Sequence, residues 1–178
     1  MGSAEVIEIP IDKQKVMLLA LVQIIMGFIG YWLLQNYSTF DNNLRYFTLP
    51  CGIVFIITAP LFVIFFIYKF FDKSPGFIIS NEGITDNSSM TSHGFIPWSE
   101  IAEIGEKQIV LRSCITLLLK NQQGYIDNAS SGYKRMSWNS TYKRYGVDAI
   151  ITSGILKCSS TKLFVMLKTG LENYNKGK

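Results

Sequence analysis

Two long apolar segments near the start of the chain constrain its architecture more than any other feature. Residues 16–34, VMLLALVQIIMGFIGYWLL, contain Gln23 as their one polar side chain, and residues 47–68, FTLPCGIVFIITAPLFVIFFIY, carry no charge. About twenty apolar residues are enough to cross a hydrocarbon core of roughly 30 Å, and lipid requires such a segment to be helical. We therefore predict two transmembrane helices over 16–34 and 47–68, joined by an external loop over 35–46.

Basic residues beside these segments predict their orientation. The lysines that flank them are Lys13, Lys15, Lys69 and Lys73, whereas Arg45 is the one basic residue of the loop. Because cytoplasmic flanks carry the excess of lysine and arginine, both termini are expected in the cytoplasm, including an N-terminal segment over 1–15. A cleaved signal peptide is the weaker alternative, since the first apolar run is too long and no small-residue cleavage site follows it.

Beyond Pro75 the pattern changes to short apolar runs separated by turn signals. Residues 76–80 and 109–119 are rich in β-branched or alternating apolar side chains, which is typical of half-buried antiparallel strands. From Ser160 the apolar residues recur at helical spacing, with Leu163 and Leu167 on the expected inner face. We predict an α+β unit over 75–178, in which curved antiparallel strands form a half-barrel and a C-terminal amphipathic helix closes its open end.

The stretch GFIPWSEI, residues 94–101, places a proline beside a tryptophan. Pro97 cannot donate a ladder hydrogen bond, so it predicts an edge position or the end of a strand over 95–98. Trp98 is then expected in the core or at the rim of the folded unit.

Several blocks of the chain, read in order, resemble one bacterial family. They are FFDKSPGFIISNEGITDNSS (70–89), IPWSEIAEI (96–104), LLLKNQQGYI (117–126) and YGVDAIITSGILKCSSTKLFVML (145–167), preceded by IEIP (7–10). The family comprises small membrane proteins with two N-terminal spans and a pleckstrin-homology-like (PH-like) domain. The resemblance implies a two-helix transmembrane hairpin in the bacterial inner membrane, followed by an antiparallel PH-like β-barrel over 75–178. PH-like folds bind lipids, phosphopeptides or proteins, and the fold alone does not choose among these ligands.

The residues that carry most enzyme chemistry are sparse. His93 is the only histidine and lies in a Ser/Thr/Gly loop, where we expect it to be exposed and without a role. The cysteines at 51, 114 and 158 have no metal-ligand spacing, and no nucleophile or phosphate-binding motif is present. We therefore predict a non-enzymatic protein with no cofactor and no metal site.

Charge is concentrated in the C-terminal part. Residues 134–178 hold nine basic and two acidic residues, a net charge of +7, whereas residues 73–133 hold four and six, a net charge of −2. The segment YKRMSWNSTYKRY (133–145) combines basic and aromatic side chains, and its candidate surface residues are Lys134, Arg135, Trp138, Tyr142, Lys143, Arg144 and Tyr145. Two interpretations stay open: the aromatic side chains contact a membrane or ligand, or they pack onto the domain and leave the basic residues solvated. Nucleic acid is not expected, because no known binding signature accompanies the charge.

Two functional hypotheses follow. In the first, the hairpin holds the domain beside the cytoplasmic leaflet, where it binds anionic lipid headgroups or a protein. In the second, the chain is a protein–protein adaptor, an assembly subunit or an inhibitor of the toxin-immunity type at the membrane. Gln23, Gly27 and Gly30 are the candidate helix–helix contact for such a partner, and self-association into a homo-oligomer is left open.

Overall fold

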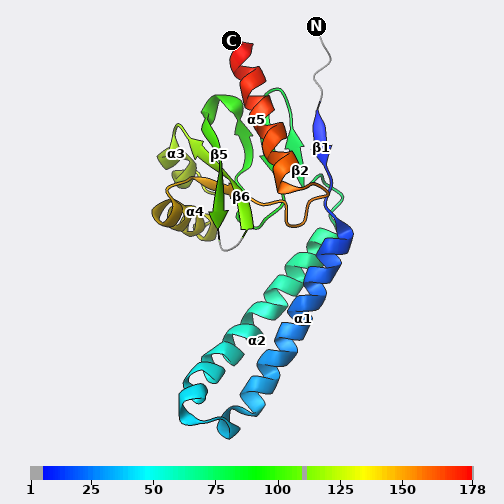
Figure 1. Cartoon of the computed structure of the whole chain (residues 1–178), viewed down its shortest axis with the longest axis vertical. Helices are drawn as coiled ribbons and strands as arrows, with labels where there is room; N and C mark the ends of the chain where they lie inside the picture. The colour runs from blue at the N-terminus through cyan, green and yellow to red at the C-terminus, as the bar shows by residue number, and fades with distance from the viewer. Residues whose placement is uncertain (1–5, 110–111, 178) are drawn as a thin grey trace. The chain divides into compact units, whose positions relative to one another are not determined.

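The computed structural model describes residues 6–109 and 112–177 and contains two long helices near the N-terminus, antiparallel strands and shorter helices (Figure 1). The α+β class predicted from the sequence is confirmed. The chain forms two compact units: unit 1 contains the residues up to Ile11 and from Ser74 onward, and unit 2 is Asp12–Lys73.

Unit 2 is a helical hairpin. Helix α1 (Lys13–Gln35) and helix α2 (Asn42–Phe71) are joined through a short 3₁₀ turn, η1 (Tyr37–Thr39). Both helices extend beyond the predicted spans, because polar residues at their ends continue the helical backbone. Each is long and apolar enough to cross a membrane, with a mean hydropathy of 2.2 for α1 and 2.6 for α2 over the most apolar window. Most side chains in these windows are exposed, unlike those of a helix in the core of a soluble protein.

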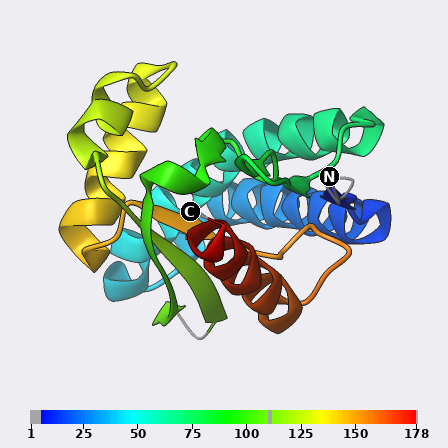
Figure 2. The same cartoon turned by 90° about the horizontal axis from the view of Figure 1, so that it is seen from above.

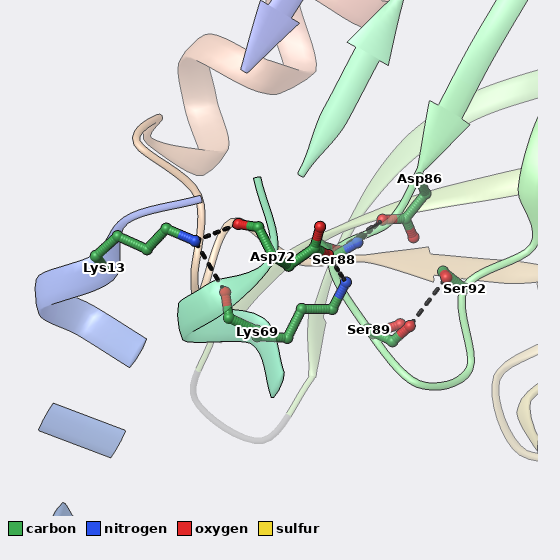
Figure 3. A network of polar contacts seen from close by, with 7 residues as sticks. All are labelled: Lys13, Lys69, Asp72, Asp86, Ser88, Ser89 and Ser92. Atoms are coloured by element: carbon green, nitrogen blue, oxygen red, sulfur yellow. Dashed lines mark hydrogen bonds and ion pairs between the residues drawn. The ribbon is translucent and has the colours of Figure 1, made fainter. Parts of the chain in front are cut away.

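The open end of the hairpin is held by lysine side chains. The Lys13 amine donates to the carbonyl oxygen of Lys69 at 3.0 Å and to that of Asp72, while the Lys69 amine lies 2.9 Å from the Asp72 carboxylate (Figure 3). The last carbonyl groups of a helix lack partners within the helix, and a cation placed there satisfies them. The N-terminus of α1 is capped in turn by the Asp12 carboxylate, which accepts from the backbone N–H groups of Gln14 and Lys15.

Glycines allow the two helices to approach each other closely. A Cβ atom at Gly30 would lie 2.7 Å from the Cβ of Phe55 and 3.1 Å from the carbonyl oxygen of Gly52. At Gly27 the nearest atom, the Cβ of Ala59, would be 3.3 Å away. Gly27 and Gly30, predicted as candidates for a helix–helix contact, thus lie at the contact between α1 and α2.

Gly30→Ala is expected to destabilise the hairpin by roughly 1–3 kcal/mol, since backbone and Cβ atoms of α2 would have to move apart. The measurement is the free energy of unfolding of the full chain in mixed detergent micelles. Gly27→Ala is the matched control and should cost clearly less. Equal losses for the two variants would contradict the assignment of Gly30 as the closest approach.

The first sheet of unit 1 contains a strand from before the hairpin. Its strands pair antiparallel in the spatial order β1-β2-β3-β4. Their bounds are β1 (Ile7–Ile9), β2 (Phe77–Ile79), β3 (Gly83–Asp86) and β4 (Gly94–Pro97). In β1, Ile9 is buried and pairs with Phe77. Strand β1 was not predicted, because residues 1–15 were expected to be a cytoplasmic segment before the first span.

The second sheet is β5-β6-β7, also antiparallel. Its strands are β5 (Ile101–Ile109), β6 (Arg112–Leu119) and β7 (Ala149–Ile151), and the 3₁₀ turn η2 (Trp98–Glu100) precedes β5. The helices of unit 1 are α3 (Gln122–Asp127), α4 (Gly132–Tyr145) and α5 (Ser160–Lys176). Helices α3 and α4 follow β6 and precede β7 in the chain, and they contact each other. Helix α5 packs against β5 and β6 (Figures 1 and 2).

These two sheets do not form the closed barrel that the resemblance implies. Among the described residues, β4 and β5 are not paired with each other, and η2 separates them. The prediction of a barrel is therefore corrected to two antiparallel sheets, packed around a common core. The C-terminal helix is present as predicted, with Leu163 and Leu167 fully buried in that core.

Trp98 lies at the centre of this core. It is 1% exposed, and its indole N–H donates to the carbonyl oxygen of Ser80 at 2.8 Å. The prediction of a core position is confirmed. Pro97 is the last residue of β4, an edge strand, in agreement with the expected strand end.

Candidate functional site: the two faces of helix α4

Helix α4 contains the whole basic, aromatic segment 133–145. The Ser131 hydroxyl accepts from the backbone N–H of Lys134 and caps its start. Gly146 ends it in the left-handed conformation, with φ of 66°, a geometry that glycine adopts without steric cost. Lys143 and Arg144 lie in the last turn, where a positive charge stabilises the helix dipole. These local signals explain a helix despite poor helix formers such as Asn139.

The inner face of α4 is attached to the loop that connects β3 and β4. Trp138 is 7% exposed, and its indole N–H donates to the carbonyl oxygen of Thr91 at 2.7 Å. The Lys134 amine donates to the carbonyl oxygen of Ser92 at 2.8 Å. The His93 imidazole stacks on the indole of Trp138, with ring centroids 4.0 Å apart and planes 11° from parallel.

The outer face of α4 carries exposed apolar and basic side chains. Tyr133 is 56% exposed and Met136 is 65% exposed, and Lys143 and Arg144 are exposed on the same side of the helix by their spacing. Tyr142 is exposed nearer the inner face. This surface, which we call the outer face, consists of Tyr133, Met136, Ser140, Lys143 and Arg144.

A cavity of about 210 Å³ lies behind α4. Its wall is formed by α4, the loop before β4, and strand β7. The polar residues that line it are Asp86, Ser92, His93, Ser137, Thr141 and Asp148.

Asp148 is fixed in this wall by the adjacent strand. It is 6% exposed; its Oδ2 accepts from the backbone N–H of Leu119 at 2.6 Å, and its own N–H donates to the carbonyl oxygen of Leu117 at 2.9 Å. The other carboxylate oxygen, Oδ1, is buried without a hydrogen-bond partner in the described part of the chain. Asp86, also buried, accepts from the backbone N–H and the hydroxyl of Ser88 at 2.8 and 2.6 Å (Figure 3).

Burial shifts the two titrating groups of this cavity in opposite directions. Burial, and secondly the positive charge of Lys134, lower the pKa of His93 from 6.5 to about 4, so the imidazole is neutral at neutral pH. Burial raises the pKa of Asp148 above its usual 3.8, and the hydrogen bond from the Leu119 N–H opposes that shift.

The structure divides the predicted candidate residues into groups with different surroundings. Trp138 and Lys134 face inward and hold the helix on the domain. Arg135, Tyr142, Lys143 and Arg144 are exposed, although the Arg135 guanidinium also donates to the carbonyl oxygen of Asp127 at 2.8 Å. Tyr145 is half-buried. Packing on the domain is therefore the interpretation that fits Trp138, whereas Tyr142 is exposed and Tyr145 is half-buried.

In the hairpin, Gln23 is half-buried, and its carboxamide has no hydrogen-bond partner within the described residues. Gly27 and Gly30 contact α2 of the same chain, as described above.

Apart from Trp138, the residues of the cavity were not predicted as site residues. His93 was expected to be exposed and without a role, whereas it stacks on Trp138. Asp86 and Asp148 are single acidic residues in separate segments, and only the fold brings them to one wall. A solitary aspartate directly before an apolar strand, as in VDAII, was the one available signal for Asp148.

Comparison of the chain with protein-family models, with curated proteins and with solved structures found no match.

The lowered pKa of His93 predicts an acid-sensitive contribution to stability. The unfolded chain binds a proton near pH 6.5 and the folded chain near pH 4, so acidification through this window favours unfolding, by up to about 3 kcal/mol. His93→Phe keeps an aromatic ring on Trp138 and removes the titration.

The measurement is the free energy of unfolding of the full chain from pH 7 to pH 4, with the variant subtracted from the wild type. The difference should shrink or change sign in favour of the variant as pH falls. Asp148 and the other carboxyl groups are present in both proteins and cancel in the subtraction. A pH-independent difference would show that His93 titrates alike in both states.

Proposed function

We propose that the chain is a membrane-anchored, non-enzymatic protein whose folded unit 1 binds anionic lipid headgroups through the outer face of α4. The observation that carries this proposal is the composition of that face. Exposed Lys143 and Arg144 lie beside exposed Tyr133 and Met136, while Trp138 on the opposite side holds the helix in place. A rigidly mounted helix with basic and apolar side chains outward suits the boundary between headgroups and acyl chains.

The membrane anchor is the helical hairpin. Unit 1 includes residues on both sides of the hairpin, so a bilayer crossed by α1 and α2 would leave both flanks on one side. Lysines lie at both flanks, which by the positive-inside rule favours the cytoplasmic side for unit 1 and for both termini. The resemblance to a bacterial family further suggests the inner membrane and a PH-like origin for the strands and C-terminal helix of unit 1.

Electrostatics favours a lipid ligand. The net charge of +7 over residues 134–178 is attached to a unit tethered by the same chain. Basic residues near an anionic leaflet each contribute about 1 kcal/mol of attraction. Tethering raises the effective concentration of the surface at the leaflet, so weak individual contacts are sufficient.

A protein partner is the second candidate, favoured by a groove of about 780 Å³ between α5 and the β1–β2 edge. Exposed apolar residues line it, including Ile7 and Val165. Such a partner fits the adaptor, assembly-subunit or immunity-type role. Crosslinking in native membranes separates the two: one reproducible protein adduct supports the partner, and adducts to lipid alone support the first proposal.

The lipid proposal predicts that Lys143→Gln with Arg144→Gln weakens vesicle binding. Full-length protein in nanodiscs of neutral lipid is mixed with separate vesicles of phosphatidylcholine, with or without abundant phosphatidylglycerol, and flotation measures the bound fraction. Loss of two charges at about 1 kcal/mol each should weaken binding to anionic vesicles by roughly 30-fold.

Lys162→Gln with Lys168→Gln is the matched control, because both side chains are exposed on α5 and the change in charge is the same. This control should retain most of the affinity. Binding that ignores lipid charge and salt, or that falls equally in both double variants, would refute a specific role for the outer face.

A further inference from the structure

The cavity behind α4 contains a buried acceptor without a partner. Oδ1 of Asp148 has no hydrogen bond within the described residues, although its neighbour Oδ2 is bonded to the Leu119 N–H. Buried polar groups in folded proteins nearly always have a partner, in the protein or in ordered water. The partner of Oδ1 is therefore expected to enter from outside the polypeptide.

The lining of the cavity selects the charge of that partner. Two buried carboxylates, Asp86 and Asp148, lie in its wall. No lysine or arginine is among the described lining residues; the nearby Lys134, whose charge acts on His93, has its amine bonded to the Ser92 carbonyl. An anion would be repelled by the carboxylates, whereas a cation that donates hydrogen bonds would satisfy Oδ1.

Size and the available side chains argue against a single water molecule or a metal ion as the occupant. The volume of about 210 Å³ corresponds to roughly seven water molecules, so it is larger than a single bridging water needs. No three His, Cys, Asp or Glu side chains of the described residues are grouped closely enough to hold a metal ion. Besides the carboxylates, the cavity offers the hydroxyls of Ser137 and Thr141, neither of which is bonded within the described part of the chain.

We propose that this cavity binds a small organic cation with a primary ammonium group. The ammonium donates to Oδ1 of Asp148 and to the hydroxyl of Thr141, and its short carbon chain lies against Trp138 and the apolar side chains of β7. An ammonium group has three N–H donors, so it can donate to two or three oxygen acceptors that lie apart from one another. This site is on the inner side of α4, so it is independent of the lipid surface on the outer face.

The test is isothermal titration calorimetry of the full chain in detergent micelles at neutral pH. Ethylammonium is the probe, ethanol is its uncharged analogue, and potassium chloride at equal ionic strength controls for screening. Saturable binding is expected for ethylammonium, with no saturable binding of ethanol or potassium. Because the micelles contain no lipid, ethylammonium binding in this assay does not require lipid headgroups. A failure of the lipid-binding proposal would therefore not change the expected result.

Two variants locate the site. Asp148→Asn keeps an acceptor for the Leu119 N–H and removes the charge, so ethylammonium affinity should fall roughly tenfold or more. Thr141→Val keeps the side-chain shape and removes a hydroxyl, and it serves as the deciding variant if Asp148→Asn does not fold. Glu103→Gln, an exposed acidic position on β5, is the matched control and should bind like the wild type.

An absence of saturable ethylammonium binding would overturn the proposal and leave the cavity to ordered water. Equal binding by ethanol would overturn the requirement for a cation. Unchanged affinity in a folded Asp148→Asn or Thr141→Val protein would place the amine elsewhere and equally overturn the assignment.

Discussion

The pairing of β1 with β2 is the constraint on which the rest of the architecture depends. β1 precedes the hairpin and β2 follows it, yet Ile9 lies opposite Phe77 in one ladder. Pro10 accepts from the Lys157 N–H, and Ile11 bridges to Leu156 in the same unit. Unit 1 is therefore completed only by residues from both sides of the hairpin. The hairpin is an insertion into one fold, and a fragment that begins after it lacks an edge strand and part of the core.

The two sheets share a core although they do not close into a barrel. Trp98 connects them, because it follows β4, precedes β5 and is bonded to Ser80 at the end of β2. Helix α5 covers this ring at Gly170, where a Cβ atom would lie 2.7 Å from the indole. A large rigid aromatic side chain against a glycine brings the helix near the sheets, and Leu163 and Leu167 then fill the space beside it.

Local patterns predicted the features whose cause is local. The apolar helices follow from length and the absence of charge, helix α5 from its helical period, and the core position of Trp98 from its place between Pro97 and Ile101. β1 was missed, because three residues, IEI, become a strand only through pairing with residues some seventy positions later. The cavity was missed for the same reason: Asp86, His93 and Asp148 come from three segments, and no spacing in the sequence relates them. The prediction of a closed barrel was wrong, because tertiary packing decides whether the edge strands of two sheets pair with each other. Strand propensity in the sequence does not encode that packing.

The two faces of helix α4 have different surroundings: the inner face is hydrogen-bonded to the domain, and the outer face is exposed. On the inner face, the side chains of Trp138 and Lys134 donate hydrogen bonds to backbone carbonyl oxygens of one loop. The helix therefore cannot rotate about its axis without losing both bonds. That anchoring keeps Lys143 and Arg144 directed outward, and it keeps Thr141 in the cavity wall. A freely rolling amphipathic helix would insert its tryptophan into lipid, whereas this one retains Trp138 in the protein. Lipid contact by α4 would therefore depend on charge and on the smaller apolar contribution of Tyr133 and Met136, which makes it sensitive to salt.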